Sequence, residues 1–189
     1  KETSVKSNNK RDLKVTSLVD GSLVLWRLAG RSLQKYEQSI LSDYCSLLDI
    51  FRELEIPIGG YISNSGSREV TQLVQLVQEQ TIEKKASETM LWDTKSSSPM
   101  ITDTVLFASF LKKGERSTLF HSRSKILDYY GDHKISYFYL HVGNEIAKIE
   151  LPRWATKKQE LVNQVASVCF QQTQIGGGYP LVLAEAHEQ

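Results

Sequence analysis

KISYFYLHVGNEIAKIEL, residues 134–151, is the stretch that decides the fold. Two alternating runs rich in aromatic and β-branched residues, 134–142 and 145–151, flank the pair Gly143-Asn144. A glycine-containing pair between two such runs is typical of a β-hairpin. The stretch therefore predicts two antiparallel strands, and it places His141 within the first of them.

Strand and helix patterns alternate on both sides of this hairpin. Residues 13–28 predict either one strand interrupted at Asp20-Gly21 or the two strands of a hairpin, and residues 56–63 predict a buried strand. Helical spacing of apolar residues predicts helices over 36–54, 68–80, 102–114, 156–174 and from about Pro180. Residues 83–100 are polar and predict a loop or insertion. This order predicts an α/β fold, with one mixed sheet flanked by helices in a single domain over residues 1–189.

Composition excludes several classes of protein. The chain has 189 residues and a formal net charge of +1, which fits a domain with its own core. The start, KETSVKSNNKRD, is not a signal peptide and predicts a flexible basic N-terminus over residues 1–12. The run SLVLWRLAG is too short to cross a membrane and is broken by Arg27. Cys45 and Cys169 lie far apart in apolar helical patterns, which favours reduced thiols in a cytoplasmic protein.

Two aspartates are candidates for chemistry. Asp20 would sit between two apolar runs, where a buried carboxylate needs a charged partner or a metal ion. A solvated Asp-Gly hairpin turn explains Asp20 more simply. Asp103 stands at the entry of an apolar helix, where an aspartate commonly caps the helix without any further function. Taken alone, each aspartate is explained better by its structural role, a turn or a helix cap, than by catalysis.

The C-terminal stretch GGGYPLVLAEAHEQ holds two further candidates, Tyr179 and His187, each of which can be functional or simply solvated. In a continuous helix, Glu185 would lie about 200° around the axis from His187, and Tyr179 would lie roughly 12 Å along it. This geometry predicts that Tyr179 and His187 contact different parts of an extended substrate, and it excludes Glu185 as a second ligand beside His187. A solvated terminal histidine is the simpler alternative.

Basic residues gather in KKGERSTLFHSRSK, residues 112–125. Arginines, serines and a phenylalanine in one run suit contact with a phosphate backbone, and a solvated basic loop is the alternative. The glycines at 176–178 lack the Lys-Ser/Thr of an ATPase phosphate loop. The candidates for contact with a phosphate backbone are Lys112, Lys113, Arg116, Arg123 and Lys125.

Taken together, five stretches resemble the NurA nuclease family, and cyanobacterial NurA-domain proteins in particular. They occur in the family's order and span most of the chain from Asp20 to His187. The stretches are VDGS at 19–22, GGYIS at 59–63, TDTVLFASFLKKGERSTLFHSRSKILDYYG at 102–131, YFYLHVGNEIAKIELPRWA at 137–155 and GYPLVLAEAH at 178–187.

The resemblance implies an RNase H-like fold and a metal-dependent DNA nuclease, active as a 5′-to-3′ exonuclease and single-strand endonuclease. It also implies Mn²⁺ or Mg²⁺ as cofactor and a homodimer that processes double-strand breaks with a HerA-type hexameric translocase. By position, the family's metal and catalytic residues fall on Asp20, Asp103 and His187. Its catalytic tyrosine, which would also contact the DNA beside the basic residues of 112–125, falls on Tyr179. One further acidic residue of the family has no clear counterpart, and Glu69 is the weak choice for it.

Phosphodiester hydrolysis needs an activated water and relief of negative charge, both of which a divalent ion with oxygen ligands supplies. The leading hypothesis is therefore a metal-dependent nuclease acting on single-stranded DNA and duplex ends. A second hypothesis is a catalytically weak RNase H-like domain that binds DNA or docks onto a translocase. A third is another RNase H-like enzyme, such as a resolvase or an RNA-directed nuclease.

Overall fold

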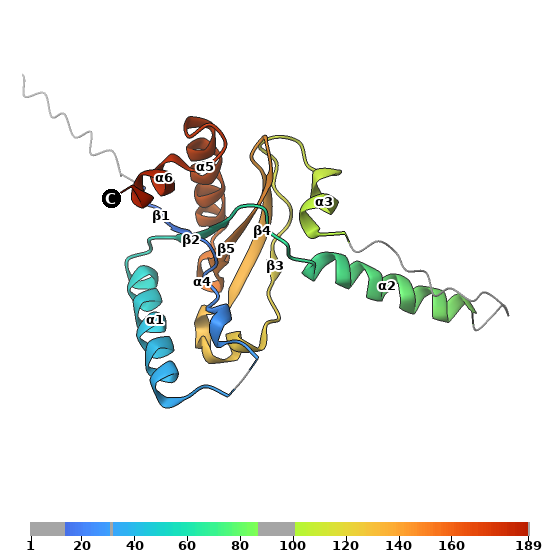
Figure 1. Ribbon diagram of the computed structural model, residues 1–189, viewed down its shortest axis with the longest axis horizontal. Coiled ribbons are helices and arrows are strands. Elements are labelled where there is room, and N and C mark those ends of the chain that lie inside the picture. Colours follow the sequence, from blue (N-terminus) through green and yellow to red (C-terminus); the bar gives the residue numbers. More distant parts are fainter. Residues whose placement is uncertain (1–13, 31, 87–100, 189) are drawn as a thin grey trace, which may run out of the picture.

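A five-stranded mixed sheet forms the centre of the molecule, with the strand order β1-β2-β5-β4-β3. The computed structural model describes residues 14–30, 32–86 and 101–188 (Figure 1). β1 and β2 are parallel, and all other neighbours are antiparallel. The strands are β1 (Ser17–Asp20), β2 (Ile58–Ile62), β3 (Phe120–His121), β4 (Ile135–His141) and β5 (Ile146–Pro152). The predicted α/β class with one mixed sheet is confirmed.

The predicted hairpin is β4 and β5, which pair from Ile135↔Pro152 to His141↔Ile146. All of β5, and β4 up to Leu140, are buried. Alternation in these strands therefore separates two cores instead of separating a core from solvent. Phe138 and Ile149 belong to the core beneath α5, whereas Tyr137 belongs to a core on the opposite face.

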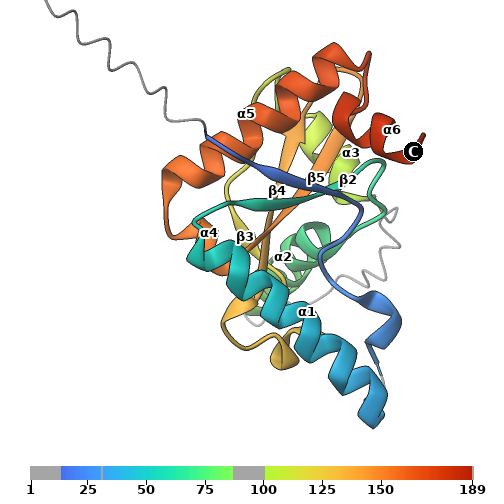
Figure 2. The same cartoon turned by 90° about the vertical axis from the view of Figure 1, so that its left-hand side faces the viewer.

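Helices cover both faces of the sheet (Figures 1 and 2). α5 and α6 pack on one face, while α1, α3 and the start of α2 pack on the other. Beyond its first turn, α2 projects away from the sheet (Figure 1). The helices are α1 (Lys35–Glu53), α2 (Glu69–Ala86), α3 (Asp103–Ala108), α4 (Arg153–Thr156), α5 (Gln159–Ile175) and α6 (Leu181–His187). Short 3-10 helices are η1 (Trp26–Leu28), η2 (Lys125–Tyr129) and η3 (Gly131–His133).

Within the part of the chain that the structure describes, no helix is both long and apolar enough to cross a membrane.

The prediction for residues 13–28 is wrong beyond β1. Leu23 and Val24 are buried as their apolar character requires, but they lie in a loop that crosses β2 at Gly60. A Cβ at Gly60 would lie 2.7 Å from the Gly21 carbonyl oxygen and 3.1 Å from Leu23 Cγ. Glycine at this position lets the loop lie directly on the strand.

Other differences concern the ends of elements. Residues 83–86 continue α2 instead of starting a loop, and residues 87–100 lie outside the described ranges. The helix predicted over 102–114 ends at Ala108, and the helix predicted over 156–174 is interrupted before Gln159. β3 was not predicted because two residues carry no periodicity. Residues 1–12 also lie outside the described ranges.

Candidate functional site

Asp20 stands at the carboxyl end of β1, where the chain turns away from the sheet. Gly21 makes this turn with φ of +104°, and its N–H donates to the Tyr61 carbonyl. Tyr179 Oη donates to Asp20 Oδ1 at 2.6 Å, and His187 Nε2 lies 2.6 Å from Asp20 Oδ2. Three of the predicted site residues are therefore assembled around one carboxylate, at the edge strand of the sheet.

The expected separation of Tyr179 from His187 is wrong. That expectation assumed one helix through both residues, but α6 begins only at Leu181 and Tyr179 lies in the turn before it. The turn brings the phenol back to the same carboxylate that His187 reaches from the end of α6. Among the described residues, Glu185 makes no side-chain contact with Asp20 and is exposed, as the helical geometry predicts.

Tyr61 and Glu145 hold the Tyr179 ring in place. The Tyr61 and Tyr179 rings meet edge to face, with centroids 5.6 Å apart. Tyr61 Oη donates to Glu145 Oε1 at 2.9 Å. Glu145 Oε2 accepts from Ser63 Oγ and from the Asn64 N–H, so the carboxylate is fixed from three sides. The sequence analysis missed both residues, since Glu145 is only the first residue of a predicted strand and Tyr61 lies within another.

The electrostatics of the cluster keep Asp20 charged. The Tyr179 hydroxyl, and to a lesser extent His187, hold the pKa of Asp20 below its usual value against the effect of partial burial. Burial and the Asp20 carboxylate raise the pKa of Tyr179, so its phenol stays a donor. The His187 side chain is 64% exposed and that of Asp20 42%. An ionised carboxylate beside an accessible imidazole can bind a cation or exchange a proton with a substrate.

Asp103 occupies a different environment from Asp20. It is 0% exposed, and its Oδ1 accepts the Thr71 N–H at 2.8 Å. Its Oδ2 accepts the Tyr139 hydroxyl at 2.7 Å, with Ser67 Oγ and the Val70 N–H at 3.2 Å. The side chain thus caps the first turn of α2 from across the fold. The predicted cap of its own helix is wrong, because Thr102 is the N-cap of α3.

The structure does not bring Asp103 together with Asp20 and His187. Within the described ranges, no three side chains of His, Cys, Asp or Glu are arranged to hold a metal ion. Asp20 and His187 alone offer the oxygen and imidazole donors that suit Mn²⁺. A hard divalent ion commonly takes one or two protein carboxylates and completes its shell with water and substrate phosphates. This pair fits such an ion, whereas Asp103 is already saturated by donors.

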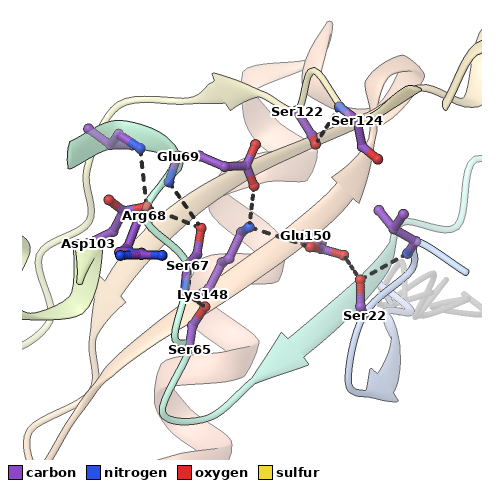
Figure 3. Close-up of polar contacts among 12 residues, drawn as sticks. Ser22, Ser65, Ser67, Arg68, Glu69, Asp103, Ser122, Ser124, Lys148 and Glu150 are labelled. Carbon is purple, nitrogen blue, oxygen red and sulfur yellow. Dashed lines mark hydrogen bonds and ion pairs between the residues drawn. The ribbon is translucent and has the colours of Figure 1, made fainter. Parts of the chain in front are cut away.

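Glu69, the weak choice for a further acidic residue, binds a buried lysine (Figure 3). Lys148 Nζ lies 2.9 Å from Glu69 Oε1 and 3.8 Å from Glu150 Oε1. It also lies 4.1 Å from the centre of the Tyr137 ring. Glu150 Oε2 in turn accepts from Ser22 Oγ at 2.7 Å and from the Leu23 N–H at 2.9 Å. The sequence analysis missed this network, because Lys148 and Glu150 alternate with apolar residues as they would in a strand with one solvated face.

The predicted DNA-binding residues of 112–125 are spread along one edge of the sheet. The segment runs antiparallel beside β4. At one end the Gly114 N–H donates to the His141 carbonyl, and at the other end the Ser122 N–H donates to the Ile135 carbonyl. Seven residues of β4 span roughly 20 Å, so Lys112 and Lys113 lie at one end and Arg123 and Lys125 at the other. Arg116 instead stacks on Phe138 and donates to Asn163 of α5.

The chain is thus a mixed α/β protein in which a carboxylate, an imidazole and a phenol are assembled at the end of an edge strand. The model of the NurA domain matches residues 9–189, nearly the whole chain. The chain therefore belongs to the NurA family, a family of nucleases that are generally metal-dependent. The resemblance inferred from the five stretches is confirmed. No curated protein and no solved structure matches the chain.

Proposed function

We propose that this protein is a DNA nuclease that hydrolyses phosphodiester bonds at Asp20, His187 and Tyr179 with Mn²⁺ or Mg²⁺. Family membership supports the reaction class. The observation that carries the proposal is the convergence of His187 and Tyr179 on one ionised carboxylate, across 167 and 159 positions of sequence. A fold needs no such convergence at an exposed strand end, whereas catalysis by positioned groups does.

Asp20 and His187 are the residues that would hold the ion. When bound, a divalent ion supplies an activated water near neutral pH and relief of charge at phosphorus. The Tyr179 hydroxyl stays protonated, and its single O–H, which here points at Asp20 Oδ1, can turn to an incoming phosphate oxygen. Tyr61 fixes the direction of that hydroxyl by packing on the Tyr179 ring. In this proposal Asp103 supports α2 and contacts neither substrate nor metal.

The finer properties of the proposal rest on the family. They are 5′-to-3′ exonuclease and single-strand endonuclease activity in double-strand break processing, an RNase H-like classification of the single domain, a homodimer and a HerA-type translocase as partner. A cytoplasmic setting suits the free cysteines Cys45 and Cys169.

A nuclease assay on labelled single-stranded and duplex DNA, with Mn²⁺, Mg²⁺ or EDTA, tests the proposal. Asp20→Asn keeps the size of the side chain and removes its charge, so we expect cleavage to fall by roughly 100-fold or more. Glu185→Gln is the matched control, because Glu185 is an exposed carboxylate of α6 near His187. Cleavage that survives Asp20→Asn would exclude the assigned site.

The alternative is a domain that binds DNA without significant catalysis. It is supported by the small number of potential metal ligands around Asp20 in the described ranges. The same assay separates the two functions. Wild-type protein that binds DNA but cleaves none with either metal would support the binding domain. Cleavage abolished both by EDTA and by Asp20→Asn would exclude it.

A further inference from the structure

A second polar site lies on the sheet face opposite α5. It is a pocket of about 720 Å³ between the loop after β1 and the start of α2, within the size range of small-ligand sites. We refer to it as the β5 pocket. Its polar lining includes Ser22, Trp26, Glu69, Arg123, Lys148 and Glu150.

One continuous chain of hydrogen bonds and ion pairs organises the β5 pocket. Trp26 Nε1 donates to Ser22 Oγ at 2.9 Å, and Ser22 Oγ donates to Glu150 Oε2 at 2.7 Å. Lys148 extends this chain to Glu69, as Figure 3 shows. The Trp26 ring is therefore held in one orientation although the residue is 47% exposed. A fixed, accessible indole is a ready surface for stacking, because little side-chain freedom remains to be lost on binding.

Arg123 places an exposed positive charge at the mouth of the β5 pocket. Its side chain is exposed at the pocket rim, and among the residues that the structure describes it makes no hydrogen bond or ion pair. Lys148, by contrast, is neutralised by the carboxylates of Glu69 and Glu150. The charge that remains open to a ligand is therefore a guanidinium, which binds phosphate groups well.

The β5 pocket is close to the Asp20 cluster along the chain. Ser22 follows Asp20 by two residues, so their Cα atoms are at most about 7.6 Å apart at 3.8 Å per step. The side chain of Asp20 lies on the α6 side of the sheet, and the crossing at Gly60 carries Ser22 to the other side. One strand of nucleic acid passing the end of β1 would thus meet both sites.

We propose that the β5 pocket binds one nucleotide of single-stranded DNA, with its base stacked on Trp26 and its phosphate on Arg123. The inference rests on the proposed function, since it names a subsite for that substrate. Stacking on an aromatic ring tolerates any base, as a nuclease that cleaves unrelated sequences requires. A base within a duplex is already stacked and paired, so the pocket selects single strands or frayed ends.

The test is binding of fluorescent oligo-dT in EDTA, measured by anisotropy, so that cleavage plays no part. Trp26→Ala should weaken binding by about tenfold, in line with the usual effect of losing one stacked base. Trp26→Phe retains an aromatic ring and should retain most of the affinity. An oligonucleotide of the same length made of abasic residues should bind the wild type more weakly than oligo-dT. Trp26→Ala should remove most of this difference.

Arg27→Ala is the matched control for Arg123→Ala, because Arg27 is also exposed, lies next to Trp26 and does not line the pocket. We expect Arg123→Ala to weaken binding several-fold more than Arg27→Ala does. Equal effects of the two substitutions would overturn the phosphate contact. An unchanged preference for oligo-dT over the abasic strand in Trp26→Ala would overturn the base contact.

Failure of the subsite and failure of the nuclease are distinguishable. Asp20→Asn should abolish cleavage while leaving the Trp26-dependent binding of oligo-dT intact, since binding is measured without metal. Loss of cleavage in Trp26→Ala at low DNA concentration, with recovery at high concentration, would further support a binding role. Trp26-dependent binding in a protein that never cleaves DNA would refute only the proposed function.

Discussion

At the scale of single residues, the two aspartates show how environment separates roles that the sequence leaves equal. Asp20 is partly exposed and contacts side chains that reach it from the far end of the chain. Asp103 is fully buried and accepts the backbone N–H groups of Val70 and Thr71. Hydrogen-bond donors surround both carboxylates, but only Asp20 is accessible to a substrate.

Asp103→Asn should therefore act on stability. The amide has one acceptor oxygen, so at least one of the backbone N–H donors faces an NH₂ group and remains unsatisfied. We expect a loss of about 2–4 kcal/mol in the free energy of unfolding, measured by urea titration. Below the unfolding transition, the variant should still cleave DNA.

Asp132→Asn provides the control for this prediction. The Asp132 side chain is 92% exposed and lies 3.8 Å from Arg52, so its replacement should change stability by less than about 0.5 kcal/mol. A folded, fully stable Asp103→Asn protein without nuclease activity would contradict the structural role and return Asp103 to the catalytic site.

At the scale of elements, the glycine pair of β2 fixes how the loop after β1 crosses the sheet. Gly60→Ala would place a Cβ 2.7 Å from the Gly21 carbonyl, a backbone atom that cannot move alone. The segment from Gly21 to Leu23 must then shift. We expect a loss of about 1–3 kcal/mol in stability and reduced cleavage, because Asp20 directly precedes that segment.

Gly66→Ala is the comparison for Gly60→Ala, since no atom lies within 4 Å of a Cβ placed there and its φ is not positive. It should be close to neutral in thermal unfolding and in cleavage. Equal behaviour of the two variants would show that the crossing at Gly60 is not under steric control.

The elements themselves were largely predictable where periodicity is strong. α1, α2, β2 and the β4–β5 hairpin follow directly from apolar spacing. The apolar run around Leu23 and Val24 led to a wrong strand prediction, because buried apolar residues in a loop give the same sequence signal as a strand. The meeting of Tyr179 with Asp20 could not be predicted from spacing, since it depends on where α6 begins. Family motifs, not local physics, singled out His187.

At the scale of the whole molecule, the pH dependence of folding should come from charges buried in the sheet. The formal net charge is only +1, so long-range repulsion contributes little near neutral pH. β5 is buried along its whole length and still carries Lys148 and Glu150, which are 4% and 2% exposed in their side chains. Burial raises the pKa of Glu150, and the Lys148 ammonium opposes that rise.

Lys148→Met tests this coupling. A carboxyl whose pKa is raised in the folded state adds stability at low pH, and that contribution is lost as the pH rises through the folded-state pKa. Without Lys148 the pKa of Glu150 rises further, so the variant should lose more stability at pH 8 than at pH 5. At pH 8 we expect a loss of about 3–5 kcal/mol, the usual effect of removing one partner of a buried ion pair.

Urea unfolding followed by circular dichroism at both pH values measures this difference. Lys158→Met is the matched control, because Lys158 pairs with Glu55 at the surface and should contribute less than about 1 kcal/mol at either pH. The double variant Lys148→Met/Glu150→Gln should recover part of the loss at pH 8, since no unpaired carboxylate then remains on β5. A loss that is the same at pH 5 and pH 8, and that Glu150→Gln does not reduce, would mean that Lys148 stabilises the sheet by packing on Tyr137 and not by its charge.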